Sequence, residues 1–213
     1  MMRQKRFLDL LVVVQVLAAA FHVYGQWTKL AMADSIHGVS LTWFGWWEIF
    51  LLLNLTLAYR AHCRCPSRET VQVIINYAVW LIAISGDLLI IAGRGIGRWT
   101  VTDSWTTLTA ILAIVIVLLS RRRLDTATKL GVVAIACRAV PQLMLAILYS
   151  AGTTTALSGI ALAAGHVAIV GRISSNLGSL TKRTDDRNRL WPMIAEAANW
   201  LTWTGLTMVW EIS

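Results

Sequence analysis

Long apolar blocks, separated by short polar stretches, dominate the chain. We identify seven such blocks of about 17 to 24 residues, each long enough to cross a hydrocarbon core of about 30 Å as a helix. A membrane-spanning β-strand needs only about 9–11 residues and alternates in polarity, which these blocks do not. The pattern therefore predicts an all-α membrane protein with seven transmembrane helices. These lie at residues 7–24, 41–59, 70–93, 104–120, 130–150, 153–171 and 192–212.

The composition supports this fold class. Of the 213 residues, 57% are apolar by type and 14% are charged, whereas about 25% of the residues in a soluble domain are charged. The mean hydropathy is +0.63. A soluble domain of this length would need more polar residues to cover its surface. The composition argues against a soluble enzyme, a secreted disulfide scaffold and a nucleic-acid-binding domain, and it makes the lipid bilayer the expected partner.

The net charge of +8 is distributed unevenly over the predicted loops. The N-terminus and the loops on its side of the membrane hold 15 of the 19 lysines and arginines, whereas the opposite side holds Lys29, Arg94 and Arg98. Because cytoplasmic loops are enriched in Lys and Arg, this distribution predicts a cytoplasmic N-terminus and an outside C-terminus. We interpret the basic clusters as topology signals rather than a nucleic-acid surface, and we expect a bacterial plasma membrane.

The first three and the last three spans contain similar features in the same order. Gln15 lies in the first span and Gln142, preceded by Pro141, lies in the fifth. The third and seventh spans both contain Asn-x-x-x-Trp, formed by Asn76 and Trp80 and by Asn199 and Trp203.

Four crossings separate the starts of these two groups of spans, so both groups have the same orientation. We therefore predict two parallel three-helix repeats, 1–93 and 129–213, joined by a linker helix and its flanking loops at 94–128.

This plan resembles the SWEET and PQ-loop superfamily, whose full-length members have three helices, one linker helix and three helices. The resemblance is carried by Pro141-Gln142, by Gly38-Val39-Ser40 before the second span, and by the asparagines of the third and seventh spans. It implies transport by alternating access, with Asn76 and Asn199 binding the substrate. Carriers of vitamin precursors share the fold. The resemblance also implies an outside N-terminus, in contrast to the orientation that the charges predict.

The paired Asn and Trp residues have a chemistry of their own. An amide offers two donors and an acceptor to hydroxyl groups, while an indole covers an apolar face, which suits a sugar, nucleoside or vitamin precursor. The alternative is an interhelical hydrogen bond, with tryptophans as interfacial anchors. Pro141 removes a backbone hydrogen bond and can bend its helix, so we assign Gln15, Pro141 and Gln142 to a hinge or gate.

Charged groups within the spans need partners, because uncompensated charge in hydrocarbon is costly. Arg138 lies near the middle of the fifth span. Glu48 is its best depth match, and Asp87 is the second choice. Either a structural ion pair or a site for an anionic substrate explains Arg138, and Glu48 or Asp87 could instead carry protons. His166 lies among small residues and is expected to be packed and hydrogen-bonded.

The function that these features favour is membrane transport of a small polar solute, without covalent chemistry. The sequence contains no recognisable catalytic cluster, metal-ligand spacing or cofactor motif, so we expect no enzyme activity, metal or cofactor. The alternative is a non-transporting integral membrane partner or receptor, which would use the same polar faces for assembly. Homo-oligomerisation is compatible with both.

Overall fold

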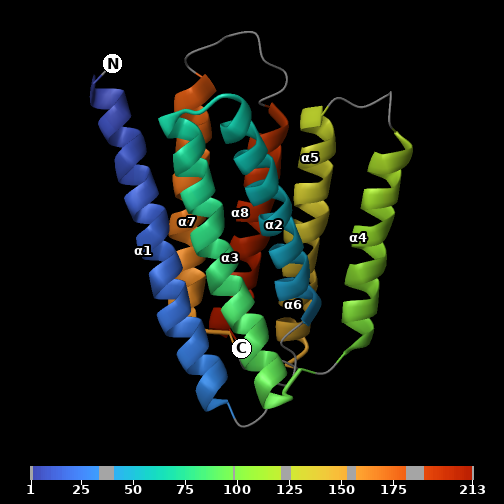
Figure 1. The fold of residues 1–213 in the computed structure, drawn as a ribbon. Helices are drawn as coiled ribbons and strands as arrows, with labels where there is room; N and C mark the ends of the chain where they lie inside the picture. Colours follow the sequence, from blue (N-terminus) through green and yellow to red (C-terminus); the bar gives the residue numbers. More distant parts are fainter. Residues whose placement is uncertain are drawn as a thin grey trace.

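The computed structural model describes residues 2–33, 41–97, 99–120, 126–152, 157–180 and 190–212. These residues form seven helical rods and contain no strand, so the all-helical prediction is confirmed (Figure 1). The helices are α1 (Met2–Met32), α2 (Leu41–Arg64), α3 (Arg68–Arg94), α4 (Val101–Leu119), α5 (Thr126–Ala134), α6 (Val140–Ser150), α7 (Gly159–Leu180) and α8 (Leu190–Ile212). A π-helical segment, η1 (Ile135–Ala139), joins α5 to α6 in one rod.

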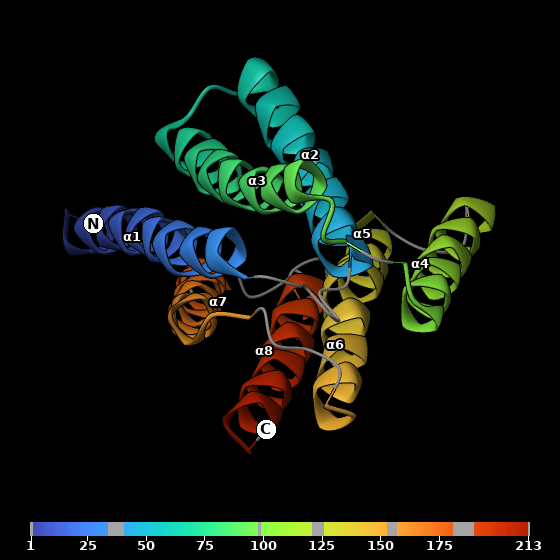
Figure 2. The same ribbon diagram turned by 90° about the horizontal axis from the view of Figure 1, so that it is seen from below.

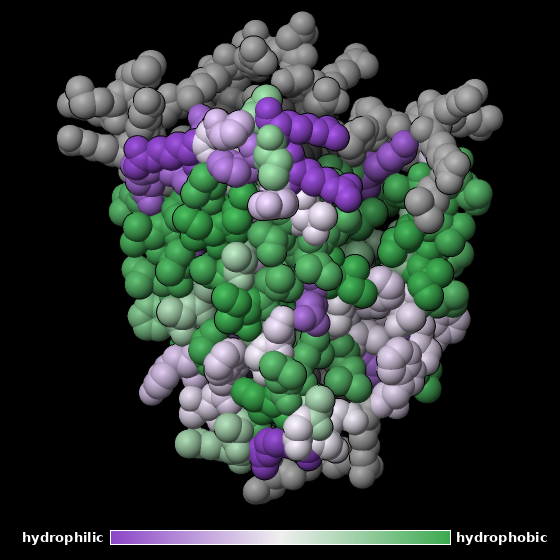
Figure 3. Space-filling model, viewed as in Figure 1, coloured by the Kyte–Doolittle hydropathy of each residue, from purple (hydrophilic) through white to green (hydrophobic). Residues whose placement is uncertain are grey.

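Four helices in the described part are long and apolar enough to cross a membrane, and they contain Asp9–Met32, Leu41–Arg64, Arg68–Arg94 and Thr128–Ser150. Two shorter apolar helices cover Val101–Val117 and Gly159–Ser174. Figure 3 shows a broad apolar band on one face, with hydrophilic residues gathered toward the end at which α1 begins. We call this end the N-terminal end of the bundle.

The sixth predicted span differs from the structure at both ends. The helix begins at Gly159 rather than at 153, because the two preceding amides are bonded elsewhere. The amide of Leu157 donates to the Tyr149 hydroxyl at 2.9 Å, and the amide of Ser158 donates to Gln26 Oε1 at 3.0 Å. The helix then continues to Leu180, nine residues past the predicted end of this span at 171.

Several sequence features lie outside the described residues. They are Gly38-Val39-Ser40, Arg98, the basic residues at 121–123 and the predicted loop residues 181–189.

The first and last three rods are packed in the same order. In the first group, α3 packs against both α1 and α2 and lies between them. In the second group, α8 packs against both the α5–α6 rod and α7 (Figure 2). The two groups meet along α1 with α7 and along α2 with the α5–α6 rod. In each group, therefore, the third helix is central, and each group contributes its first and second helices to the interface.

The chain reverses direction between successive rods. Figure 1 shows that α1, α3, α5 and α8 begin at the N-terminal end of the bundle, whereas α2, α4 and α7 begin at the other end. On α3, α6 and α8, a residue with a higher number therefore lies farther from the N-terminal end of the bundle.

Local sequence sets the ends of α3. Ser67 and Thr70 form a capping box in which the Thr70 amide donates to Ser67 Oγ at 3.1 Å. At the other end Gly95 adopts φ 61°, a left-handed conformation that glycine enters without steric cost. The chain after α3 therefore turns sharply toward α4.

Asp103 fastens α4 to the start of α2. Its Oδ2 accepts hydrogen bonds from the Thr100 amide at 2.8 Å and hydroxyl at 2.6 Å, which caps α4. Its Oδ1 accepts from the Thr42 amide at 3.2 Å and hydroxyl at 2.7 Å. The first amides of a helix have no partner within the helix, so this one carboxylate satisfies donors at the ends of two helices.

The π-helical segment ends at Ala139, two residues before Pro141. Proline lacks an amide hydrogen, and its ring collides with the carbonyl four residues earlier, which here belongs to Cys137. Widening the turn to π geometry over Ile135–Ala139 relieves that collision. Arg138 lies within this π-helical segment.

Replacing Asp103 with alanine is predicted to lower the free energy of unfolding by about 1–3 kcal/mol, because donors on both helices lose their acceptor. Thermal unfolding of the purified protein in detergent measures this change. Asp103→Asn keeps one carbonyl oxygen and is expected to fall between Asp103→Ala and the wild type. A wild-type unfolding temperature for Asp103→Ala would contradict the double-capping role.

Candidate functional site

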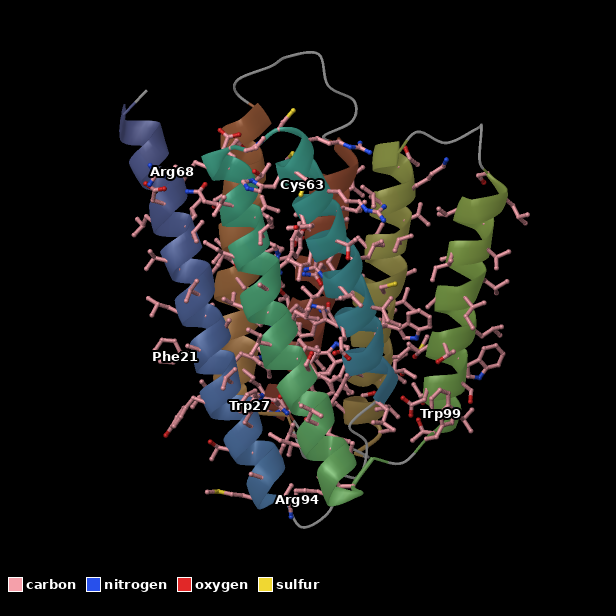
Figure 4. All side chains as sticks on the ribbon, viewed as in Figure 1. Phe21, Trp27, Cys63, Arg68, Arg94 and Trp99 are labelled. Atoms are coloured by element: carbon pink, nitrogen blue, oxygen red, sulfur yellow. The ribbon has the colours of Figure 1, made fainter. Side chains whose placement is uncertain are left out.

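Aromatic and polar side chains are buried in the interior between the two groups of helices. Four tryptophans contributed by α2, α3 and α8 form what we call the tryptophan cluster: Trp43, Trp47, Trp80 and Trp203. All four are buried, with at most 5% of each residue exposed. By contrast Phe21, labelled in Figure 4, lies on the outer surface of α1 and is 58% exposed.

Trp47 holds the tryptophan cluster together. Its ring stacks on Trp80 of α3 at a centroid distance of 5.6 Å and meets Trp203 of α8 edge-on at 6.0 Å. The ring centroid of Trp43 lies 5.6 Å from that of Trp47 and 5.8 Å from that of Trp203. The central helices α3 and α8 are therefore connected through two indoles of α2.

Hydrogen bonds fix the orientation of the two predicted tryptophans. Trp80 Nε1 donates to Gln15 Oε1 at 3.3 Å, and Gln15 Nε2 donates to the Ala168 carbonyl on α7 at 2.6 Å. Trp203 Nε1 donates to the Leu162 carbonyl, also on α7, at 2.9 Å. Gln15, predicted as part of a hinge, thus links α1, α3 and α7.

The close approach of Trp203 to α7 depends on Gly165. A Cβ atom at this position would overlap the indole ring of Trp203. Gly86 on α3 receives the ring of Trp27 in the same way, and Trp27 Nε1 donates to the Ala83 carbonyl at 3.1 Å. Small residues let these indoles lie flat against neighbouring helices.

The two predicted asparagines each leave one amide atom without a partner. Gln142 Nε2 donates to Asn199 Oδ1 at 2.9 Å, while Gln142 Oε1 accepts from the Thr202 hydroxyl at 2.7 Å. Asn199 Nδ2 is buried and has no hydrogen-bond partner among the described residues, and the same is true of Asn76 Oδ1. One unpaired atom is a donor and the other is an acceptor.

Helix geometry places the two asparagines at similar depth. Asn76 precedes Trp80 by four residues on α3, and Asn199 precedes Trp203 by four residues on α8. Both helices begin at the N-terminal end of the bundle, and residues four apart lie on one helical face. Each asparagine therefore lies about one helical turn from its tryptophan, toward the N-terminal end of the bundle.

The partner of Arg138 is Glu196, so the prediction of Glu48 or Asp87 is wrong. Arg138 Nη1 donates to Glu196 Oε1 at 2.7 Å and Nη2 donates to Oε2 at 3.2 Å. Arg172 of α7 also donates from Nε to Glu196 Oε2 at 3.1 Å. We call these three residues the arginine–glutamate cluster.

The other two carboxylates have partners of their own. Glu48 accepts a hydrogen bond from the Ser85 hydroxyl on α3 at 2.6 Å. Asp87 Oδ2 and His22 Nε2 form a hydrogen bond of 2.8 Å, and neither side chain is exposed. The packing of α3 against α1 and α2 therefore assigns both acids to neighbours within the first group of helices, which keeps them away from Arg138.

His166 is hydrogen-bonded, as predicted, and is half-buried. Its Nε2 lies 3.0 Å from the Thr207 hydroxyl on α8. The second helix of each group thus joins a polar side chain, Glu48 or His166, to a hydroxyl on the third helix.

Sequence reasoning missed two residues that shape this interior, Arg172 and His22. Arg172 was counted among the basic topology signals, although only 17% of its side chain is exposed. His22 contacts both Trp47 and Trp80 edge-on, with ring centroids 6.0 and 5.5 Å away. A helical-face analysis could have found His22, which lies seven residues after Gln15, but nothing in the sequence pairs Arg172 with α8.

No group of His, Cys, Asp and Glu side chains among the described residues could hold a metal ion. Comparison of the chain with protein-family models, with curated proteins and with solved structures finds no match. The geometry of the described residues is therefore the basis for a functional proposal.

Gly165→Ala is predicted to destabilise the protein by about 1–3 kcal/mol, because the added Cβ displaces the buried Trp203 ring. Gly205→Ala is the matched control on α8, where no described atom lies within 4 Å of the new methyl group. It should be neutral or stabilising by up to about 1 kcal/mol, since alanine favours helix. Thermal unfolding of the two variants tests this packing of Trp203 against α7. Equal unfolding temperatures for the two variants would refute it.

Proposed function

We propose that this protein is a membrane transporter of a small polar solute, working by alternating access between its two three-helix groups. The sugar, nucleoside and vitamin-precursor classes remain the candidate substrates. The observation that carries the proposal is the pair of buried amide atoms, Asn76 Oδ1 and Asn199 Nδ2, that lack partners among the described residues.

An unpaired buried polar atom costs free energy of about 1–3 kcal/mol, so such atoms in a folded protein need an explanation. A solute with a hydroxyl group can donate to Asn76 Oδ1 and accept from Asn199 Nδ2. The tryptophan cluster, one helical turn away, offers flat apolar faces of the kind that cover a sugar or nucleobase ring. Both asparagines, and Trp80 and Trp203 of the cluster, are residues that the sequence singled out for binding.

The direction of the polar faces favours transport over an assembly role. Asn199 and Trp203 are each 1% exposed, and Trp80 is also 1% exposed. A protein that used these faces to bind a membrane partner would present them on its outer surface. The surface instead exposes large apolar side chains, including Leu89 at 72% and Ile116 at 55%.

The arrangement of the helices supports alternating access. The two groups have the same packing order, which is the arrangement expected of a duplicated three-helix unit with 94–128 as the linker. The π-helical segment before Pro141 lies in the rod that contacts α2 of the other group. Interruptions of this kind recur at functional sites, and we assign the hinge or gate to Pro141 and Gln142.

The resemblance to the SWEET and PQ-loop superfamily is part of this proposal. It agrees with the order of the helices and with the asparagines on the third and seventh rods. We propose a plasma-membrane location with the N-terminus in the cytoplasm, because the basic residues concentrate on that side. The N-terminal end of the bundle, with the arginine–glutamate cluster in its half, then faces the cytoplasm.

Uptake into proteoliposomes tests the proposal, with radiolabelled sugars, nucleosides and vitamin precursors as the panel. One class should be taken up saturably and should raise the unfolding temperature, because a ligand that binds the folded state stabilises it. Asn76→Ala and Asn199→Ala should each weaken apparent affinity by about 3- to 10-fold, the effect of one lost hydrogen bond.

Asn54→Ala is the control for these variants. The Asn54 side chain donates to the Phe50 carbonyl of its own helix at 2.8 Å, so its loss should leave uptake unchanged. Uptake no greater than that of empty liposomes across the panel would refute transport of these classes. Uptake that is equal in the wild type and in both asparagine variants would refute the binding role of the asparagines.

A further inference from the structure

The charges of the arginine–glutamate cluster do not balance. Two guanidinium groups, those of Arg138 and Arg172, share the single carboxylate of Glu196. The exposed side-chain fractions are 4% for Arg138, 17% for Arg172 and 11% for Glu196, so the cluster is largely removed from solvent. Among the described residues, this leaves one positive charge in excess within the arginine–glutamate cluster.

Neither arginine can relieve this excess by losing a proton, since the guanidinium group stays charged in proteins. A neutral pair of Arg138 and Glu196, bonded through both Nη atoms, would be sufficient to hold η1 against α8. The second guanidinium adds a charge whose burial is costly without a matching anion. A purely structural ion pair does not account for Arg172.

Arg138 also has a hydrogen-bond donor to spare. Its Nε atom is buried and has no partner among the described residues. The Phe50 ring lies against the guanidinium with its centroid 5.0 Å from Cζ, which covers one face of the group with an aromatic surface. An oxyanion approaching in the guanidinium plane would meet this donor and the excess charge together.

The cluster lies directly beside the layer of amides. Glu196 precedes Asn199 by three residues on α8, and Arg138 precedes Gln142 by four residues along the rod that contains η1 and α6. Residues three or four apart on a helix are neighbours on one face. A solute that contacts Asn199 therefore needs to extend by about one helical turn, roughly 5 Å, to reach the guanidinium groups.

We propose that the transported solute is acidic, and that Arg138 and Arg172 bind its carboxylate or phosphate group while the asparagines bind its hydroxyl groups. This inference rests on the proposed transport function and narrows its substrate class from polar solutes to oxyanion-bearing ones. Glu196 holds the two arginines in position and keeps the net charge of the empty site at one.

Thermal unfolding in a neutral detergent tests the inference with matched probes. The panel contains glucose, glucuronate and glucose 6-phosphate, uridine and uridine monophosphate, and acetate and inorganic phosphate alone, all at constant ionic strength. At least one acidic member should stabilise the protein at a concentration about tenfold or more below that of its neutral parent. Comparing glucuronate with glucose 6-phosphate distinguishes a carboxylate site from a phosphate site.

Two substitutions of Arg172 separate binding from structure. Arg172→Gln leaves the pair of Arg138 and Glu196 neutral, so the preference for the acidic members should fall by about tenfold. Arg172→Lys keeps the charge and should retain most of the preference. If acidic and neutral members are equally effective in the wild type, or if Arg172→Gln keeps the preference, the inference is overturned.

The result also separates this inference from the transport proposal. Stabilisation by neutral members that is lost in Asn199→Ala, without any gain from an acidic group, overturns the acidic substrate and leaves transport standing. An absence of stabilisation and of uptake for every member overturns both. Phosphatidylglycerol is added to the same assay as a separate probe. Stabilisation by it, but by none of the soluble anions, assigns the cluster to a lipid headgroup and likewise overturns the acidic substrate.

Discussion

The contact of Trp47 with Trp80 and Trp203 is the interaction on which the rest of this interior depends. The central helices α3 and α8 belong to different groups, and the indoles of α2 connect them. A large rigid ring can make this connection only if its neighbours leave room for it. Glycine provides that room at Gly165, where Trp203 lies against α7. The aromatic packing thus sets the separation of the helices that carry the polar side chains.

Around this aromatic centre the polar groups are divided between the two groups of helices. The first group pairs His22 with Asp87, both without exposed surface. The second group pairs Arg138 with Glu196, and Gln15 reaches across from α1 to the Ala168 carbonyl of α7. Because hydrocarbon supplies no hydrogen-bond partners, each buried polar group needs one inside the bundle. The buried polar atoms that have no partner among the described residues are therefore the ones that need an explanation.

Much of the fold could be predicted from the pattern of apolar residues, since span length and hydropathy are local properties. The predicted spans at 41–59 and 70–93 fall within α2 and α3. The ends of each helix lie within five residues of the predicted ends. The start of α7 could not be predicted in this way. The amide of Leu157 is bound by Tyr149 of α6, and the amide of Ser158 is bound by Gln26 of α1.

The sequence by itself determined which residue types face the interior: Asn76, Asn199 and their tryptophans follow from helical periodicity and from the repeated Asn-x-x-x-Trp. It also determined that Arg138 needs an acid, because a buried guanidinium cannot discard its charge. Only the tertiary structure decided which acid. Depth along a helix is readable from sequence, but rotation about the helix axis and the choice of neighbours are not. The packing of the α5–α6 rod and α7 against α8 brings Arg138 and Arg172 to the same carboxylate, so the excess charge exists only in the folded bundle.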